Sequence, residues 1–274
     1  MFDDHAQPLS GTSVVVTGGA RGLGRAMTEA LAHAGASVLV VDIDEEPIID
    51  VMTEVSGTVV GHRADIADED QVAEIVTRCM STFGSIDMVI NNAGIGMSAI
   101  RPGDRYANPV RFWELDEHWM QSFFEVHVMG PFYLSKAALE PMRAQGFGRI
   151  VTVTTSLSTM LAGGNSPYGM MKAASEALCA AMARDLEGTD ITANILIPGG
   201  AANTRYVPEV EGRSRDDLVQ PVVMGAPAVF LASRASDPVN ARRIIAKLWD
   251  PGSSDEENLA RASAPIGWPS TRPL

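Results

Sequence analysis

The sequence predicts an α/β fold in one domain over residues 1–274, built on a doubly wound parallel sheet of about seven strands with helices on both faces. Strand-like and helix-like patterns alternate from end to end, which is typical of a parallel sheet covered on both sides. The length suits one large α/β domain, and no linker or repeat divides it. A glycine-rich turn directly follows the first predicted strand.

Short apolar runs rich in β-branched residues predict the strands, and helical periodicity predicts the segments between them. The expected strands cover 12–17, 37–42, 58–64, 86–91, 148–154, 191–197 and 242–247. The clearest helix is 68–83, where Asp68 can cap the first turn. Its apolar residues form one stripe: Val72, Ile75, Val76, Cys79 and Phe83.

Three segments interrupt this alternation. The stretch 98–114, which holds Phe112 and Trp113, is expected to be a functional or mobile loop, or else a surface insertion anchored by packed aromatic rings. Residues 199–221 combine proline, glycine and charge, and are expected to form a substrate loop. From about residue 251 we expect an extended C-terminal tail that crosses a neighbouring surface or is loosely ordered.

The composition limits the classes of partner. With 21 basic and 34 acidic residues the net charge is −13, which disfavours nucleic acid and anionic membranes. Cys79 and Cys179 lack metal-ligand spacing, so we expect free thiols in a reducing compartment and no metal site. Residues 1–8 do not resemble an export signal, and no apolar run is long enough to span a membrane. A cytoplasmic location is therefore expected.

The first strand runs directly into Gly18-Gly-Ala-Arg-Gly-Leu-Gly24, which opens a helical pattern that stops at Gly35. Glycines are needed at such a turn because a Cβ would keep the backbone away from a pyrophosphate. The first amides and the positive dipole end of the new helix attract the same anion. This strand, turn and helix predict a dinucleotide site.

The second strand ends in Asp42, which favours NAD as the dinucleotide. A carboxylate at this place can accept both ribose hydroxyls of an adenosine and would repel the 2′-phosphate of NADP. Ile43 adds no compensating cation, although Arg21 in the glycine turn could serve a phosphate. NADP is therefore the less favoured cofactor.

Tyr168 and Lys172 are four residues apart in an alanine-rich helical segment. That spacing places both groups on one helix face, where the lysine charge favours the tyrosinate and lowers the phenol pKa from about 10. The pair therefore indicates a tyrosine that can act as an acid or a base. The spacing alone occurs in many helices, so its meaning depends on the dinucleotide site.

With these motifs in one chain, the sequence resembles the short-chain dehydrogenase/reductase family over nearly its full length, which implies a Rossmann-like fold. The segment 17–24 is similar to the family's cofactor turn, Asp65 to the residue that meets the adenine, and 91–94 to the motif that braces the central sheet. Pro198, Gly199 and Thr204 resemble the segment near the nicotinamide. The expected cofactor-binding residues are Gly18, Arg21, Gly22, Leu23, Gly24, Asp42, Ile43, Asp65, Ile66, Asn92, Ala93, Gly94, Tyr168, Lys172, Pro198, Gly199 and Thr204.

The resemblance implies hydride transfer between an alcohol carbon and the nicotinamide, while Tyr168 takes or gives the hydroxyl proton and Lys172 holds the nicotinamide ribose. A hydroxyl from the end of the fifth strand should donate to the substrate oxygen. The family usually carries a serine pair there, whereas this chain reads Val151-Thr-Val-Thr-Thr-Ser156. If the family's spacing between this hydroxyl residue and the tyrosine is kept without a gap, Thr155 takes the donor position. If the alignment shifts by one residue, Ser156 takes it. We favour Ser156 because serine is the family's donor.

His127 marks a second departure from the family. It stands where the family carries an asparagine that supports a proton relay to bulk water. A neutral imidazole, kept neutral by the nearby lysine, could accept a proton from an ordered water and make the relay sensitive to pH. Alternatively, His127 only packs beside Lys172 and turnover is slower.

The leading hypothesis is an NAD-dependent oxidoreductase that interconverts a secondary alcohol and a ketone. The alternative is a catalytically weak dinucleotide-binding sensor or scaffold of the same fold. Candidate pocket residues suggest a mostly apolar site with one cation: Met97, Trp113, Leu157, Met160, Arg205 and Tyr206. The resemblance also implies a homotetramer or dimer that packs through the segments 119–142 and 168–186, which carry apolar residues beyond one core-facing stripe.

Overall fold

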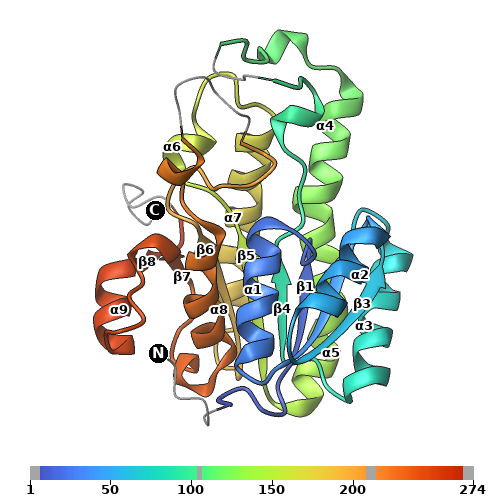
Figure 1. The fold of residues 1–274 in the computed structure, drawn as a ribbon, viewed down its shortest axis with the longest axis vertical. Helices are drawn as coiled ribbons and strands as arrows, with labels where there is room; N and C mark the ends of the chain where they lie inside the picture. The colour runs from blue at the N-terminus through green and yellow to red at the C-terminus, as the bar shows by residue number, and fades with distance from the viewer. Residues whose placement is uncertain (1–6, 104–106, 208–213, 268–274) are drawn as a thin grey trace.

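The computed structural model describes residues 7–103, 107–207 and 214–267 (Figure 1). Its strands form one eight-stranded sheet in the order β3-β2-β1-β4-β5-β6-β7-β8. All neighbours pair in parallel except β7 and β8, which are antiparallel. The α/β fold and its doubly wound parallel sheet are confirmed, with one strand more than predicted. The strands are β1 Ser13–Thr17, β2 Ser37–Asp42, β3 Thr58–Arg63, β4 Met88–Asn91, β5 Gly148–Val153, β6 Ile191–Ile197, β7 Arg242–Ile245 and β8 Ser263–Pro265.

Helices cover both faces of the sheet (Figure 1). The helices α1, α2 and α8 contribute to the apolar core on one face, and α3, α5 and α7 to the core on the other. Within the described ranges no helix has both the length and the apolar character needed to cross a membrane. The helices are α1 Gly22–His33, α2 Glu45–Glu54, α3 Glu69–Phe83, α4 Glu117–Phe124, α5 Gly130–Gln145, α6 Leu157–Met160, α7 Tyr168–Asp185, α8 Gly225–Ala232 and α9 Asp255–Ala262.

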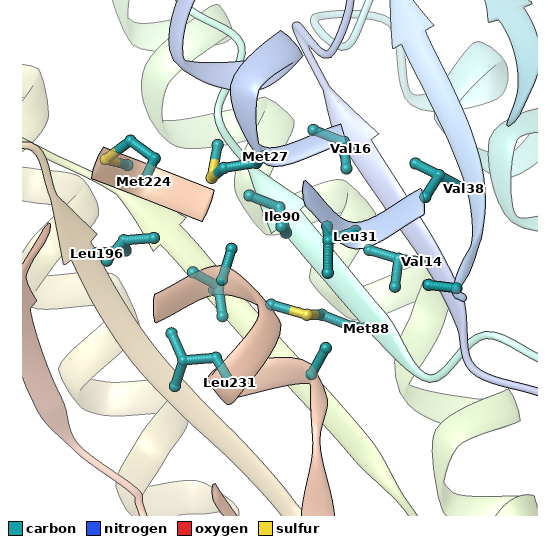
Figure 2. Close-up of a cluster of buried hydrophobic side chains, with 14 of the residues drawn as sticks. Val14, Val16, Met27, Leu31, Val38, Met88, Ile90, Leu196, Met224 and Leu231 are labelled. Atoms are coloured by element: carbon teal, nitrogen blue, oxygen red, sulfur yellow. The ribbon is translucent and has the colours of Figure 1, made fainter. Parts of the chain in front are cut away.

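The core on the α1 side joins strand and helix side chains that are fully buried. Val14 and Val16 of β1 lie in one cluster with Met27 and Leu31 of α1 and with Met88 of β4 (Figure 2). All five have no exposed surface. Because burying one such side chain stabilises the fold by about 1.5–3 kcal/mol, this cluster fixes α1, and with it the glycine turn at its start, against the sheet.

Helix α3 begins where the sequence predicts. The Asp68 side chain accepts hydrogen bonds from the amides of Asp70 and Gln71, which satisfies two of the helix's unpaired donors. The helix ends at Gly84, which has a φ of 83° and therefore adopts the left-handed conformation that glycine tolerates.

Between α4 and α5 the helix is interrupted by a π-helical turn, Glu125–Met129 (η3). Such turns are rare and occur often at functional sites. This turn contains His127, whose side chain is buried. The wider turn directs this ring toward the carboxyl edge of the sheet, where the backbone of Ile95 lies.

The two predicted loops are only partly described, because residues 104–106 and 208–213 lie outside the described ranges. In the first loop Phe112 and Trp113 meet edge to face with ring centroids 5.0 Å apart. They are 72% and 71% exposed, so they are not the packed anchor that was one of the two expectations.

The prediction of an extended tail from about residue 251 is wrong for the described part of that segment. Ser254 and Glu257 form a capping box that starts α9, and β8 then pairs with β7. The Asn258 side chain bonds to both the amide and the carbonyl of Asp250, which folds the segment back. The Ser-x-x-Glu spacing was the sequence signal for this helix; residues 268–274 lie outside the described ranges.

Candidate active site

The site lies at the carboxyl ends of the parallel strands. The strand order reverses between β1 and β4, which leaves a crevice where doubly wound sheets bind ligands. Two hydrogen bonds join the ends of β1 and β4 at this crevice. The Thr17 hydroxyl accepts from the backbone amide of Asn92 at 3.0 Å, and the Asn92 side chain donates to the Thr17 carbonyl at 2.9 Å. A cavity of about 890 Å³ opens above it.

The glycine turn forms one wall of the cavity because larger residues do not fit. A Cβ on Gly18 would lie 2.8 Å from the Ala93 Cα, and Gly18 has a φ of 59°. A Cβ on Gly24 would lie 2.0 Å from the Gly18 carbonyl oxygen. Helix α1 begins at Gly22, and no described side chain caps its first amides. Uncapped amides at the start of a helix favour the binding of an anion.

A carboxylate and an ion-pair cluster stand at the β2 end of the cavity. Asp42 lines the cavity and its side chain accepts from the Asp44 amide at 3.3 Å. The Asp44 carboxylate in turn lies 2.8 Å from Arg21 and 3.8 Å from Arg205. The charge of Arg21 is therefore partly neutralised by Asp44. Asp42 forms no ion pair with any of the described residues.

Tyr168 and Lys172 line the same cavity from α7. The Lys172 ammonium lies 5.9 Å from the centre of the Tyr168 ring and donates to the Val153 carbonyl at 2.8 Å. Lys172 is only 6% exposed, and this burial lowers its pKa to about 8. At neutral pH the side chain is still mainly cationic, so it places a positive charge beside the phenol.

The two candidate hydroxyl donors, Thr155 and Ser156, lie in different surroundings. Thr155 lines the cavity together with Tyr168, whereas Ser156 is absent from the lining residues. The Ser156 hydroxyl instead caps α6 and accepts from the Thr159 amide at 3.1 Å. The structure thus engages the Ser156 hydroxyl at the start of α6, and the choice of donor between Thr155 and Ser156 stays a prediction.

His127 lines the cavity but is bonded to the protein through one ring nitrogen. Its Nε2 lies 2.8 Å from the Ile95 carbonyl oxygen, and its ring meets that of Tyr168 edge on at 5.5 Å. Burial, and secondarily the charge of Lys172, hold the pKa of His127 well below its usual value. Nε2 also lies 3.3 Å from the Ile95 amide nitrogen, and Nδ1 is buried with no hydrogen-bond partner among the described residues. A neutral ring in this place fits both the relay and the packing alternative.

Most of the residues expected from the sequence are brought together. The cavity is lined by every predicted cofactor residue except Gly24 and Gly199. Of the candidate pocket residues it includes Met97, Arg205 and Tyr206, but not Trp113, Leu157 or Met160. Among the described residues, no three metal-ligating side chains converge.

Several lining residues were missed from the sequence, among them Ile95, Thr154, Thr159 and Arg215. Thr154 was within the threonine run at the end of β5, whereas Arg215 carries no motif and is placed by its bond to the Thr204 carbonyl. Tyr206 lines the cavity, and its hydroxyl donates to the Gly94 carbonyl. Its ring lies against Gly96, where an added Cβ would come within 2.7 Å of the ring.

Comparison with known proteins agrees with this geometry. The family model described as short chain dehydrogenase matches residues 12–213, which include the glycine turn, Tyr168 and Lys172. The chain belongs to this family. It is therefore an oxidoreductase of the short-chain dehydrogenase/reductase class, whose members bind a nicotinamide dinucleotide and act on small molecules.

Two curated relatives and one solved structure illustrate the similarity. A fluoren-9-ol dehydrogenase from Terrabacter sp. (strain DBF63) is 31% identical over 204 residues, which span 70% of this chain and 56% of that relative. A cyclohexanol dehydrogenase from Rhodococcus sp. (strain TK6) is 29% identical over 80% of this chain and 84% of its own length. The crystal structure of levodione reductase has a TM-score of 0.75 at 26% identity, covering 85% of this chain and 94% of that one.

The burial of His127 predicts a pH dependence of stability. Its pKa is lowered in the native state, so as the pH falls below about 6.5 the unfolded state binds more protons than the native state and the protein loses stability. Between pH 7 and 5.5 this residue should account for a loss of about 1 kcal/mol in the free energy of unfolding.

Urea unfolding at the two pH values measures this effect. His127→Asn should lose correspondingly less stability on acidification than the wild type, and His118→Asn, at an exposed position, should behave as the wild type does. An equal loss in His127→Asn and the wild type would contradict the prediction.

Proposed function

We propose that this chain is an NAD-dependent oxidoreductase that interconverts a secondary alcohol and a ketone, with Tyr168 as the acid and base. The observation that carries the proposal is that Tyr168, Lys172 and Thr155 line one cavity with the glycine turn. The cavity also fits the cofactor: the glycine turn leaves backbone room for a pyrophosphate, and Asp42 offers acceptors for ribose hydroxyls. When bound, the nicotinamide supplies the carbon that accepts or delivers the hydride.

Each side chain then has a defined task. In the oxidation direction the Tyr168 oxygen removes the proton from the alcohol hydroxyl, and in reduction it returns one. The Lys172 ammonium stabilises the tyrosinate and, because it already donates to the Val153 carbonyl, is held in place by the end of β5. The Thr155 hydroxyl donates to the reacting oxygen of the substrate and stabilises the charge that develops there.

The substrate region favours an apolar alcohol. Beyond the candidate catalytic groups it is lined by Ile95, Met97, Ala99 and Val207, with the Tyr206 ring lying against Gly96. Cyclohexanol and fluoren-9-ol, named in the two relatives, are therefore suitable members of a panel of secondary alcohols. NADH formation with such a panel tests the proposal, whereas cofactor binding without turnover on any member would favour the sensor or scaffold.

Tyr168→Phe removes only the ionisable oxygen, so cofactor binding should persist while turnover falls about 100-fold or more. Cofactor fluorescence and NADH formation measure the two quantities. Tyr133→Phe on α5, which does not line the cavity, is the matched control and should keep both. Near-normal turnover in Tyr168→Phe would show that the assigned acid and base is wrong.

Thr155→Val should lower the catalytic rate by about 100-fold, the usual effect of losing one donor to a developing oxyanion, while Thr155→Ser should retain most of it. Ser156→Ala should cost less catalytic rate, because that hydroxyl caps α6. The rates on one good alcohol at saturating cofactor give the ranking. A costlier Ser156→Ala would return the role to Ser156.

NAD should bind at least about tenfold more tightly than NADP, equivalent to about 1.4 kcal/mol. Asp42 would repel the 2′-phosphate of NADP. The Arg21 guanidinium, which could otherwise bind that phosphate, is paired with Asp44. Fluorescence titration with the two reduced cofactors measures the ratio. Equal or tighter binding of NADP contradicts the prediction.

We also propose a homotetramer built through α5, α7 and the segment before α5. Apolar side chains remain exposed there: Phe124 (42%), Phe132 (37%) and Met170 (47%). Sedimentation at micromolar concentration should give four times the chain mass of 29.1 kDa. A species of 29.1 kDa alone would refute the assembly.

A further inference from the structure

A buried ion pair contacts two residues that line the cavity, Thr154 and Thr155. Glu176 of α7 has no exposed surface, the Arg243 side chain on β7 is 9% exposed, and their Oε1 and Nη1 atoms are 2.5 Å apart. Neither residue lines the cavity. Buried charges are costly to place in a core, and an ion pair there is no more stabilising than well-packed apolar residues. The further contacts of the two side chains indicate what this pair does.

Both members of the pair hold the end of β5. The second guanidinium nitrogen of Arg243, Nη2, donates to the Thr155 carbonyl. The second carboxylate oxygen of Glu176, Oε2, accepts from the Thr154 hydroxyl at 3.1 Å. With Lys172 bonded to the Val153 carbonyl, three consecutive residues are each held by a charged side chain.

The contacts of Glu176 and Arg243 lie just beyond the last residue of β5, where the hydrogen bonds of the sheet end. Strand β5 ends at Val153, and its hydrogen bonding to β6 extends only to a 3.3 Å bond from the Thr154 amide to the Leu196 carbonyl. Beyond this point the Arg243 fork fixes the Thr155 backbone. A planar guanidinium bonds a carboxylate and a carbonyl through one rigid fork, whereas a lysine ammonium is a point charge on a flexible stem and holds two partners less firmly.

We propose that Arg243 and Glu176 are positioning residues that hold the Thr155 hydroxyl at the reacting oxygen of the substrate. The inference rests on the proposed function, because it assigns the donor role to Thr155. It adds two residues that touch neither substrate nor cofactor and act only through the turn after β5. Catalysis is sensitive to such placement, since an error of about 1 Å in a reacting group can cost about 100-fold in rate.

Arg243→Lys tests the proposal because it keeps a charge near Glu176 but cannot also reach the Thr155 carbonyl with a fork. The catalytic rate should fall about tenfold with little change in NADH affinity. In a protein that already carries Thr155→Val, Arg243→Lys should lower the catalytic rate by less than roughly twofold, because the hydroxyl that Arg243 positions is gone. The matched control is Arg242→Lys, whose guanidinium bonds the Ser263 hydroxyl at the sheet edge.

The order of the Thr155 methyl group, measured by NMR relaxation on threonine-labelled protein, is a readout that does not need turnover. It should fall in Arg243→Lys and not in Arg242→Lys. An unchanged methyl order, an unchanged rate, or equal losses of rate in both backgrounds would overturn the proposal. If Arg243→Lys does not fold, the double change Glu176→Gln with Arg243→Met, which leaves no lone buried charge, takes its place.

The proposed function can fail separately. If the wild type is inactive on the alcohol panel, or Tyr168→Phe remains active, the assignment of the reaction is wrong. The methyl order of Thr155 in the Arg243 variants still decides whether the ion pair positions this residue.

Discussion

The parallel pairing of β1 with β2 on one side and with β4 on the other is the constraint on which the rest of the structure depends. It places α1 and α2 on one face of the sheet and α3 and α5 on the other, and it opens a crevice where the connections from β1 and β4 diverge. Because the strands are parallel, the loops that follow β1, β2, β3, β4, β5 and β6 all contribute residues to this crevice. Residues as far apart in sequence as Gly18, Asn92 and Thr155 therefore share one cavity.

The electrostatics of the site depend on the exclusion of water. Burial lowers the pKa of Lys172 and keeps His127 neutral, so that one cation and one neutral ring stand beside Tyr168. In such surroundings a charge acts more strongly than it would in solution. The buried Glu176 and Arg243 balance each other, and the Lys172 ammonium lies 5.9 Å from the centre of the phenol ring.

Local patterns in the sequence predicted the fold and most of the cavity, because strand, glycine turn and helix signals depend on neighbouring residues. The capping role of the Ser156 hydroxyl could not be predicted this way, since it depends on where a four-residue helix begins. The ion pair between Glu176 and Arg243 could not be predicted either, because the two residues are 67 positions apart and belong to no sequence motif. Strand β8 has three residues, too few for a period to be recognised.

The antiparallel strand β8 also changes what the sheet presents to other molecules. An uncovered parallel edge offers a row of unpaired amides and carbonyls on which another chain can add a strand. β8 occupies that edge of β7, is only three residues long, and ends in Pro265, which has no amide hydrogen to donate. Residues 263–265 thus make this edge of the sheet a poor template for intermolecular strand addition and for the aggregation that follows from it.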